Sequence, residues 1–259
     1  MAKDAAAKPA RRSSPVKNGY LILYNAVSAV LWATVLGRTV GTNIIRGPAF
    51  VYISTGDFVL WTQTLMIMDV LHALFGKQSR PDELSIDEPF YIADFGQYIY
   101  TQQILTLFSP AGIVRSDPVT AAAQVASRYV AVWAVQYPFP ALCSSPIYSS
   151  MLFAWSLTEV IRYSYLALKL AGSEPYAFLW VRYSSYLVLY PVGILSEMGM
   201  MYLALGPAGQ KFGQPYQAFL LACLGLIWPA GAYILIGHMN KQRRKVLRAA
   251  KEQNVKATQ

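Results

Sequence analysis

Residues 180–202 read WVRYSSYLVLYPVGILSEMGMMY, and this stretch decides both the fold and the candidate chemistry. It is apolar enough to lie in a membrane, yet it contains Arg182, Tyr190 and Glu197. A carboxyl group at bilayer depth costs roughly 3 kcal/mol on insertion scales, so we expect Glu197 to face a protein interior or a wet cavity. Tyr190 and Glu197 are seven residues apart, about 20° short of two helical turns and roughly 10.5 Å along the axis. On a continuous helix both side chains therefore point to one side, as an acid/base pair requires.

The pair has two interpretations, and the residues alone leave both open. Pro191 removes a backbone donor and Gly193 adds slack, so we expect the helix to bend between them, which can open a pocket. In such a pocket the phenol and the carboxyl group exchange protons with a substrate. In the alternative, Tyr190 and a protonated Glu197 only hydrogen-bond to neighbouring helices and hold them together.

Composition places the rest of the chain in a membrane as well. Of the 259 residues, 55% are hydrophobic and 14% are charged, against about 25% charged in soluble domains. The net charge of +9 comes from basic residues gathered at the two ends, which suits orientation in a membrane better than binding of nucleic acid. The two cysteines give neither a disulfide framework nor a metal-binding CxxC pattern. We therefore expect an all-α, polytopic integral membrane protein.

Apolar runs predict six transmembrane helices, over residues 20–36, 58–75, 118–135, 147–170, 176–205 and 216–236. Gly56 and Asp57 are expected to interrupt the second apolar segment, and residues 37–48 and 206–215 are expected to be loops. The predicted domains are a disordered cytosolic head over 1–18, a six-helix membrane domain over 19–238 with a polar insertion at about 77–111, and a basic cytosolic tail over 239–259.

The basic residues also predict the orientation of the chain. With six spans both termini lie on one side, and sixteen Lys and Arg residues fall on that side against three on the other. Because cytosolic loops carry the excess of Lys and Arg, we expect both termini in the cytosol.

A set of polar residues lies inside the predicted spans. Glu159 and Arg162 are three residues apart and share a helix face, as do Asp69 and His72. We interpret the first two as a structural ion pair that fixes helix geometry, and the second two as polar contacts between helices. The one other histidine, His238, does not give a metal-site spacing, so no metal is expected. The remaining members of the set are Gln124, Arg128, Arg182, Tyr190 and Glu197.

Two longer stretches resemble a known family. WSLTEVIRYSYL, residues 155–166, and RYSSYLVLYPVGILSE, residues 182–197, look like the signature stretches of the 3-hydroxyacyl-CoA dehydratase family, also called protein tyrosine phosphatase-like. YLILYNAVSAVLW near the start, GIVRS at 112–116 and QVASR at 124–128 extend the resemblance over roughly residues 20–238. The chain departs from the family in two places: Asp69 stands where Glu is usual, and the family has almost nothing at the insertion.

The resemblance implies a reaction and a place in the cell. The reaction removes water from a very-long-chain (3R)-3-hydroxyacyl-CoA and gives the trans-2-enoyl-CoA, the third step of fatty acid elongation in the endoplasmic reticulum membrane. The catalytic pair of the family maps onto Tyr190 and Glu197. One group must take the α-proton beside the thioester and another must protonate the departing β-hydroxyl, with no metal or cofactor. We assign Glu197 as the base and Tyr190 as the acid, and the reverse assignment stays open.

The other polar residues and the partners follow from the same resemblance. Arg182, Arg162, Glu159 and Arg128 are expected to orient the substrate or to support the pair. The expected partners are the hydroxyacyl-CoA and membrane lipid, without nucleic acid, and partnership with other elongation enzymes is left open. The rival function is a non-catalytic membrane scaffold or lipid-binding member of the same fold. Turnover of a 3-hydroxyacyl-CoA by the purified protein separates the two.

Overall fold

The computed structural model describes residues 15–69 and 127–257, and these residues form helices and turns without a strand among them. The first part holds α1 (Pro15–Arg46) and α2 (Val51–Leu65). The second part holds α6 (Pro146–Leu170), α7 (Tyr176–Arg182), α8 (Tyr186–Phe212), α9 (Gln214–Ala222) and α10 (Trp228–Ala257). The first part also holds the 3₁₀ turn Pro48–Phe50. The second part also holds the 3₁₀ turn Pro140–Ser144 and two π-helical segments, Val130–Gln136 and Cys223–Ile227.

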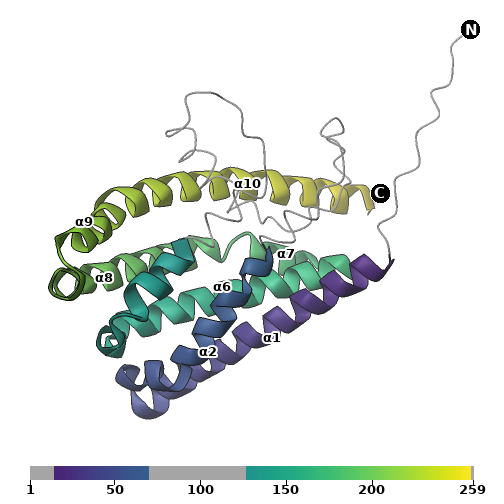
Figure 1. Ribbon diagram of the computed structural model, residues 1–259. Helices are drawn as coiled ribbons and strands as arrows, with labels where there is room; N and C mark the ends of the chain where they lie inside the picture. The colour runs from purple at the N-terminus through teal and green to yellow at the C-terminus, as the bar shows by residue number, and fades with distance from the viewer. Residues whose placement is uncertain (1–14, 70–126, 258–259) are drawn as a thin grey trace, which may run out of the picture.

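Helix α6 lies between two other long helices. It packs against α1 and against α8, and α8 in turn packs against α9. Figure 1 shows α10 along the side of the bundle farthest from α1, and it shows the first turn of α1 and the last turn of α10 at the same end of the bundle. The core between the helices is made of large side chains that are almost fully buried, among them Trp32, Tyr148, Met151, Trp155 and Met201.

The outer surface of the bundle is apolar. Three helical stretches of the described residues are long and apolar enough to cross a membrane: Asn18–Arg46, Tyr176–Phe212 and Gln214–Arg248. Large apolar side chains on the outer faces are left uncovered, for example Ile45 and Ile53, each 80% exposed, and Tyr233, 84% exposed. An apolar exterior of this extent is unfavourable in water and suits contact with lipid. The apolar helices therefore suggest a membrane protein.

Two predicted loops are largely helical. Helix α1 continues through most of residues 37–48 and ends at Arg46, just before Gly47, whose φ of +87° is a conformation that favours glycine. Helix α8 continues through Pro207 to Phe212, and the chain reverses at Gly213, where φ is +86°. Ala204 and Ala208 are fully buried, so packing against the bundle holds the last turns of α8 in a helix despite the proline. The sequence pattern placed both boundaries too early because it records propensity and not packing.

The helices are not interrupted at the residues where the sequence predicted an interruption or a bend. Helix α2 runs unbroken through Gly56 and Asp57, and α8 runs unbroken through Pro191 and Gly193. The break falls instead at residues 183–185, between α7 and α8, where the N–H groups of Ser184 and Ser185 both donate to the carbonyl of Val181. The helix predicted over 147–170 is confirmed, and a turn with Gly172 at φ +82° follows it.

Several predictions fall wholly or partly outside the described residues. These are His72 and Gln124, residues 1–14 of the head predicted over 1–18, the polar insertion at about 77–111, and parts of the spans predicted over 58–75 and 118–135. Residues 15–18 of that head belong to α1. Of the last span, residues 127–129 are α-helical and lead directly into the π-helical segment Val130–Gln136.

Candidate active site

Helix α8 carries both members of the proposed pair. Because α8 is continuous from Tyr186 to Phe212, Tyr190 and Glu197 point to the same side, roughly 10.5 Å apart along the axis. Both residues are partly buried. On the same helix, a Cβ at Gly193 would lie 3.6 Å from the Cβ of Ala154 on α6. Helices α6 and α8 therefore approach closely between the two members of the pair.

The carboxyl group of Glu197 is held by two indole rings from two other helices. The Nε1–H of Trp155 on α6 donates to its Oε1 at 2.7 Å. The Nε1–H of Trp228, the first residue of α10, donates to its Oε2 at 2.7 Å. An indole N–H is a donor only, whereas an ionised carboxylate is an acceptor only. The arrangement therefore uses both oxygens of Glu197 as acceptors, which an ionised carboxylate supplies more strongly than a protonated one.

Tyr190 lies in an aromatic setting. Its ring packs edge-on against the ring of Tyr186, with centroids 5.7 Å apart. Tyr186 in turn donates its hydroxyl to Oδ1 of Asn240 on α10 at 2.7 Å. The structure thus fixes the ring of Tyr190 through Tyr186. Its hydroxyl makes no hydrogen bond to the residues described here.

A network of buried charges connects α6 to α1 and to the helical residues 67–69 that follow α2. Arg162 donates from Nε to Oε2 of Glu159 at 2.6 Å, and its Nη2 lies 3.3 Å from Oδ2 of Asp69. Asp69 also accepts the hydroxyls of Tyr163 at 3.0 Å and Tyr24 at 2.6 Å. The predicted ion pair of Glu159 and Arg162 is thus present, and Asp69 is a contact between helices as expected. Asp69, Glu159 and Arg162 are each at most 5% exposed.

Arg128 joins this network to the residues around Glu197. Its Nη2 lies 3.5 Å from Oε1 of Glu159. Its guanidinium also stacks over the ring of Trp155, 4.3 Å from the centroid. A continuous set of contacts therefore runs from Asp69 to Glu197, through Arg162, Glu159, Arg128 and Trp155. Arg182 is also buried, at the end of α7, and its guanidinium lies 5.9 Å from the ring of Tyr183.

The sequence analysis did not predict the aromatic side chains that donate hydrogen bonds to Glu197 and to Asp69. Trp155 begins the signature stretch that also holds Glu159 and Tyr163, so its place in that motif was a usable signal. Tyr24 lies in the family-like stretch at residues 20–32 and Trp228 in another apolar run, but both runs have the composition of ordinary membrane helices. Nothing in the local pattern distinguishes them from residues that only face lipid.

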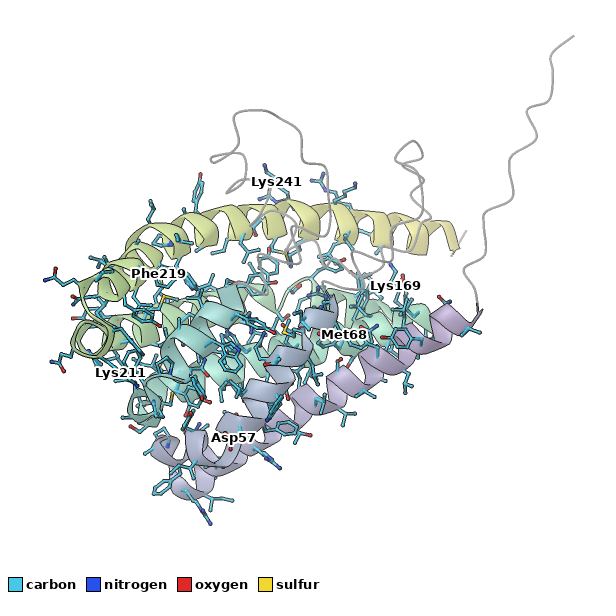
Figure 2. The ribbon with its side chains drawn as sticks, viewed as in Figure 1. Asp57, Met68, Lys169, Lys211, Phe219 and Lys241 are labelled. Atoms are coloured by element: carbon cyan, nitrogen blue, oxygen red, sulfur yellow. The ribbon has the colours of Figure 1, made fainter. Side chains whose placement is uncertain are left out.

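A cavity of about 540 Å³ lies away from the pair. Tyr52, Asp57, Gln136 and Lys211 are among its lining residues. In Figure 2 the labelled Asp57 and Lys211 lie at the end of the bundle opposite to Lys169. Lys211 is fourteen residues beyond Glu197 on α8, a rise of roughly 21 Å. This cavity is therefore not formed by the pair. Within the described residues, no three His, Cys, Asp or Glu side chains gather as a metal site would require.

The fold and the site define a class of protein. It is an all-helical protein suited to a membrane, with a phenol and a carboxylate on one helix and a network of buried charges beside them. The model of the family described as protein tyrosine phosphatase-like protein, PTPLA, matches residues 101–249, and the chain belongs to this family.

Relatives in other organisms carry related names. The chain is 37% identical to a probable very-long-chain (3R)-3-hydroxyacyl-CoA dehydratase of Schizosaccharomyces pombe, over 92% of this chain and 97% of the relative. It is 30% identical to the very-long-chain (3R)-3-hydroxyacyl-CoA dehydratase PASTICCINO 2A of Oryza sativa subsp. japonica, with the same coverage. It is 28% identical to the very-long-chain (3R)-3-hydroxyacyl-CoA dehydratase 2 of Homo sapiens, over 92% of this chain and 84% of the relative. No solved structure matches the chain.

Proposed function

We propose that this protein is a hydro-lyase that converts a very-long-chain (3R)-3-hydroxyacyl-CoA to the trans-2-enoyl-CoA, the third step of fatty acid elongation. The names of the relatives give the reaction and the substrate class. The observation that carries the assignment to this chain is the carboxylate of Glu197, held by two indole N–H groups on the same side of α8 as the Tyr190 phenol.

The two groups supply the two proton transfers of the elimination. Glu197 takes the proton from the carbon next to the thioester carbonyl, and the electrons of that C–H bond form the new carbon–carbon double bond. The C–O bond at the β-carbon breaks, and the departing hydroxyl takes the phenol proton of Tyr190 to leave as water. The proton on Glu197 then returns to the phenolate, directly or through water, which restores both groups. Atoms and charge balance without a metal or a redox cofactor.

The hydrogen bonds of Glu197 favour its assignment as the base. Both carboxylate oxygens accept from donors that cannot themselves accept a proton. Each oxygen still has a lone pair for the substrate proton. The hydroxyl oxygen of a protonated Glu197 is a weaker acceptor than a carboxylate oxygen, so two indole donors favour the ionised form. The phenol of Tyr190, with its hydroxyl unengaged by the described residues, is left as the acid.

The charged neighbours divide into two roles. Arg162 binds Glu159 and Asp69, and Glu159 also binds Arg128. We therefore assign Arg162 and Glu159 to structural support of the pair. Arg128 supports Trp155 by stacking on its ring. Arg182 lies eight residues before Tyr190 and is the residue that we assign to orienting the thioester.

We further propose six membrane spans in the endoplasmic reticulum, with both termini in the cytosol. In Figure 1 the described helices run alternately in opposite directions along the bundle, in the order α1, α2, α6, α8 and α10, with the segment at 127–136 before α6. The start of α1 and the end of α10 share one end, and Lys169 lies at that end in Figure 2, opposite to Lys211. This agrees with an excess of basic residues on the cytosolic side.

The break between α7 and α8 supports access of the CoA group from that cytosolic end. Measured from Tyr186, Tyr190 lies about 6 Å and Glu197 about 16 Å along α8. Arg243 of α10 donates to the hydroxyl of Ser184 in the break at 3.3 Å. Further basic side chains of α10 follow it, namely Arg244, Lys245, Arg248 and Lys251. A cationic surface beside the break attracts the phosphates of CoA, while the acyl chain lies among apolar helices.

Turnover of purified variants tests the proposal. Tyr190→Phe removes only the hydroxyl, and Glu197→Gln removes the ionisable acid at constant shape. If both groups act in the transition state, each variant should lose a factor of roughly 10²–10⁴ in kcat. The double variant should lose much less than the product of the two, because groups that act together are not additive. Near-normal kcat per folded molecule in either single variant would refute the assignment.

The same assay also tests the rival function. A scaffold or lipid-binding member of the family predicts no turnover of a 3-hydroxyacyl-CoA by the folded wild-type protein in detergent. Measured dehydration of the substrate to the enoyl-CoA, followed by absorbance or mass, would exclude a purely structural role.

A further inference from the structure

We infer that Trp155 and Trp228 are positioning residues that fix the carboxylate of Glu197 in the plane needed for proton abstraction, a role that rests on the proposed dehydratase function. Each indole donates its N–H to a different carboxylate oxygen at 2.7 Å. The two rings come from α6 and α10, so they hold Glu197 from two separate helices. The rings are 2% and 3% exposed.

The two hydrogen bonds determine the orientation of a side chain that would otherwise rotate. A glutamate has three side-chain torsions, and the last of them is broad. Two donors on two oxygens select one rotation of the carboxylate, because any other rotation leaves buried indole N–H groups without an acceptor. A base fixed in this way meets the substrate proton without reorganisation.

Two features around the indoles agree with a positioning role. The guanidinium of Arg128 lies 4.3 Å from the centroid of Trp155, so a cation draws density from the ring and strengthens the N–H as a donor. Trp228 directly follows the π-helical segment Cys223–Ile227. A π-helical turn holds an extra residue and changes the direction in which later side chains point, and such turns are frequent at functional sites.

The alternative is that both indoles are only large side chains of the core. Trp155 is a member of the buried core cluster, as is Trp228. Under that alternative, replacing either by phenylalanine lowers stability and leaves the chemistry of each folded molecule unchanged. Under the positioning role, the loss of the N–H lowers kcat of the folded molecules.

Phenylalanine variants distinguish the positioning role from a role in core packing alone. Trp155→Phe and Trp228→Phe keep an aromatic ring and remove the donor. We expect kcat per folded molecule to fall by about 10- to 100-fold with KM within a factor of a few, as for misplacement of a catalytic group. Trp61→Phe is the matched control, because Trp61 is 69% exposed on α2 and should keep wild-type kcat. Unchanged kcat in both folded phenylalanine variants would overturn the inference.

A double-variant comparison distinguishes failure of the inference from failure of the proposed function. If the indoles act through Glu197, adding Trp228→Phe to Glu197→Gln should cause no further loss of kcat. Independent, multiplied losses would show that Trp228 acts elsewhere. If Glu197→Gln alone keeps normal kcat, the dehydratase assignment of the pair fails first. Normal kcat in the tryptophan variants alone overturns only the positioning role.

A measurement on folded protein with both indoles intact covers the case in which the phenylalanine variants do not fold. In ¹⁵N-labelled protein, a hydrogen bond to a carboxylate shifts an indole N–H proton resonance downfield. We expect two such resonances, and both should move upfield in Glu197→Gln, while the resonance of Trp61 stays in place. Two resonances that do not respond to Glu197→Gln would overturn the inference.

Discussion

Glu159 shows how single charges are kept among apolar helices. It binds Arg162 at 2.6 Å and Arg128 at 3.5 Å, and Arg162 also binds Asp69 at 3.3 Å. Two carboxylates and two guanidinium groups give this buried network no net charge. Removing one partner from such a network leaves a charge without compensation, which costs far more than breaking an exposed pair. The energetic role of each charge therefore depends on its burial and not on its type.

Glu159→Gln should therefore destabilise the fold without removing the chemistry. We expect a loss of about 3–5 kcal/mol in the free energy of unfolding, the range for breaking a buried ion pair. Thermal unfolding in detergent measures it, and kcat per folded molecule should stay within a few-fold of wild type. The matched control is Glu174→Gln, in the exposed pair with Lys169, which should cost no more than about 1 kcal/mol. Equal Tm values for the two variants would contradict this account of the network.

At the scale of elements, the contact between α6 and α8 places the residues of the site. Gly193 on α8 faces Ala154 and Trp155 on α6, and a methyl group at Gly193 would lie 3.6 and 3.9 Å from their side chains. A hydrogen bond between the hydroxyls of Ser150 and Ser196, 2.7 Å, joins the same two helices. The separation of α6 and α8 thus sets the distance from Trp155 to Glu197.

Substitution at Gly193 tests this spacing. Alanine makes ordinary van der Waals contacts there, so Gly193→Ala should keep near-normal kcat and Tm. The larger side chain of Gly193→Val forces the helices apart, at a cost of about 1–3 kcal/mol for overpacking. It should also lower kcat per folded molecule, because the bond from Trp155 to Glu197 lengthens. Turnover and thermal unfolding of both variants check this, and a Gly193→Val protein that behaves as Gly193→Ala does would contradict it.

At the scale of the whole molecule, several charged groups are buried inside the bundle while large apolar side chains lie on its outer surface. The buried polar residues include Asp69, Glu159, Arg162 and Arg182, while Ile45 and Ile53 are among the most exposed. This is the reverse of a water-soluble protein and fits lipid as the surrounding solvent. The start of α1 and the end of α10 lie at the same end of the bundle in Figure 1, which constrains where the termini emerge.

Protease treatment of sealed microsomes tests the orientation. Tags at the N-terminus and the C-terminus should both be cleaved, because both termini are proposed to be cytosolic. A protease site inserted at Gly213, where α8 reverses into α9, is the control and should be protected. Protection of either terminal tag, or cleavage at Gly213 in intact microsomes, would contradict the proposed arrangement.

From the sequence one could predict the class of protein, the position of α6, the likeness to the family and the spacing of Tyr190 and Glu197. Each of these depends on composition or on residues close together in the chain, because hydrophobic periodicity and helical spacing are local properties. Only the tertiary structure shows which distant side chains contact Glu197 and Arg162. Trp155 and Trp228 lie 42 and 31 residues from Glu197, and Asp69 lies 93 residues from Arg162. Such contacts depend on where packed helices cross and how they are rotated, which side-chain packing over the whole bundle sets.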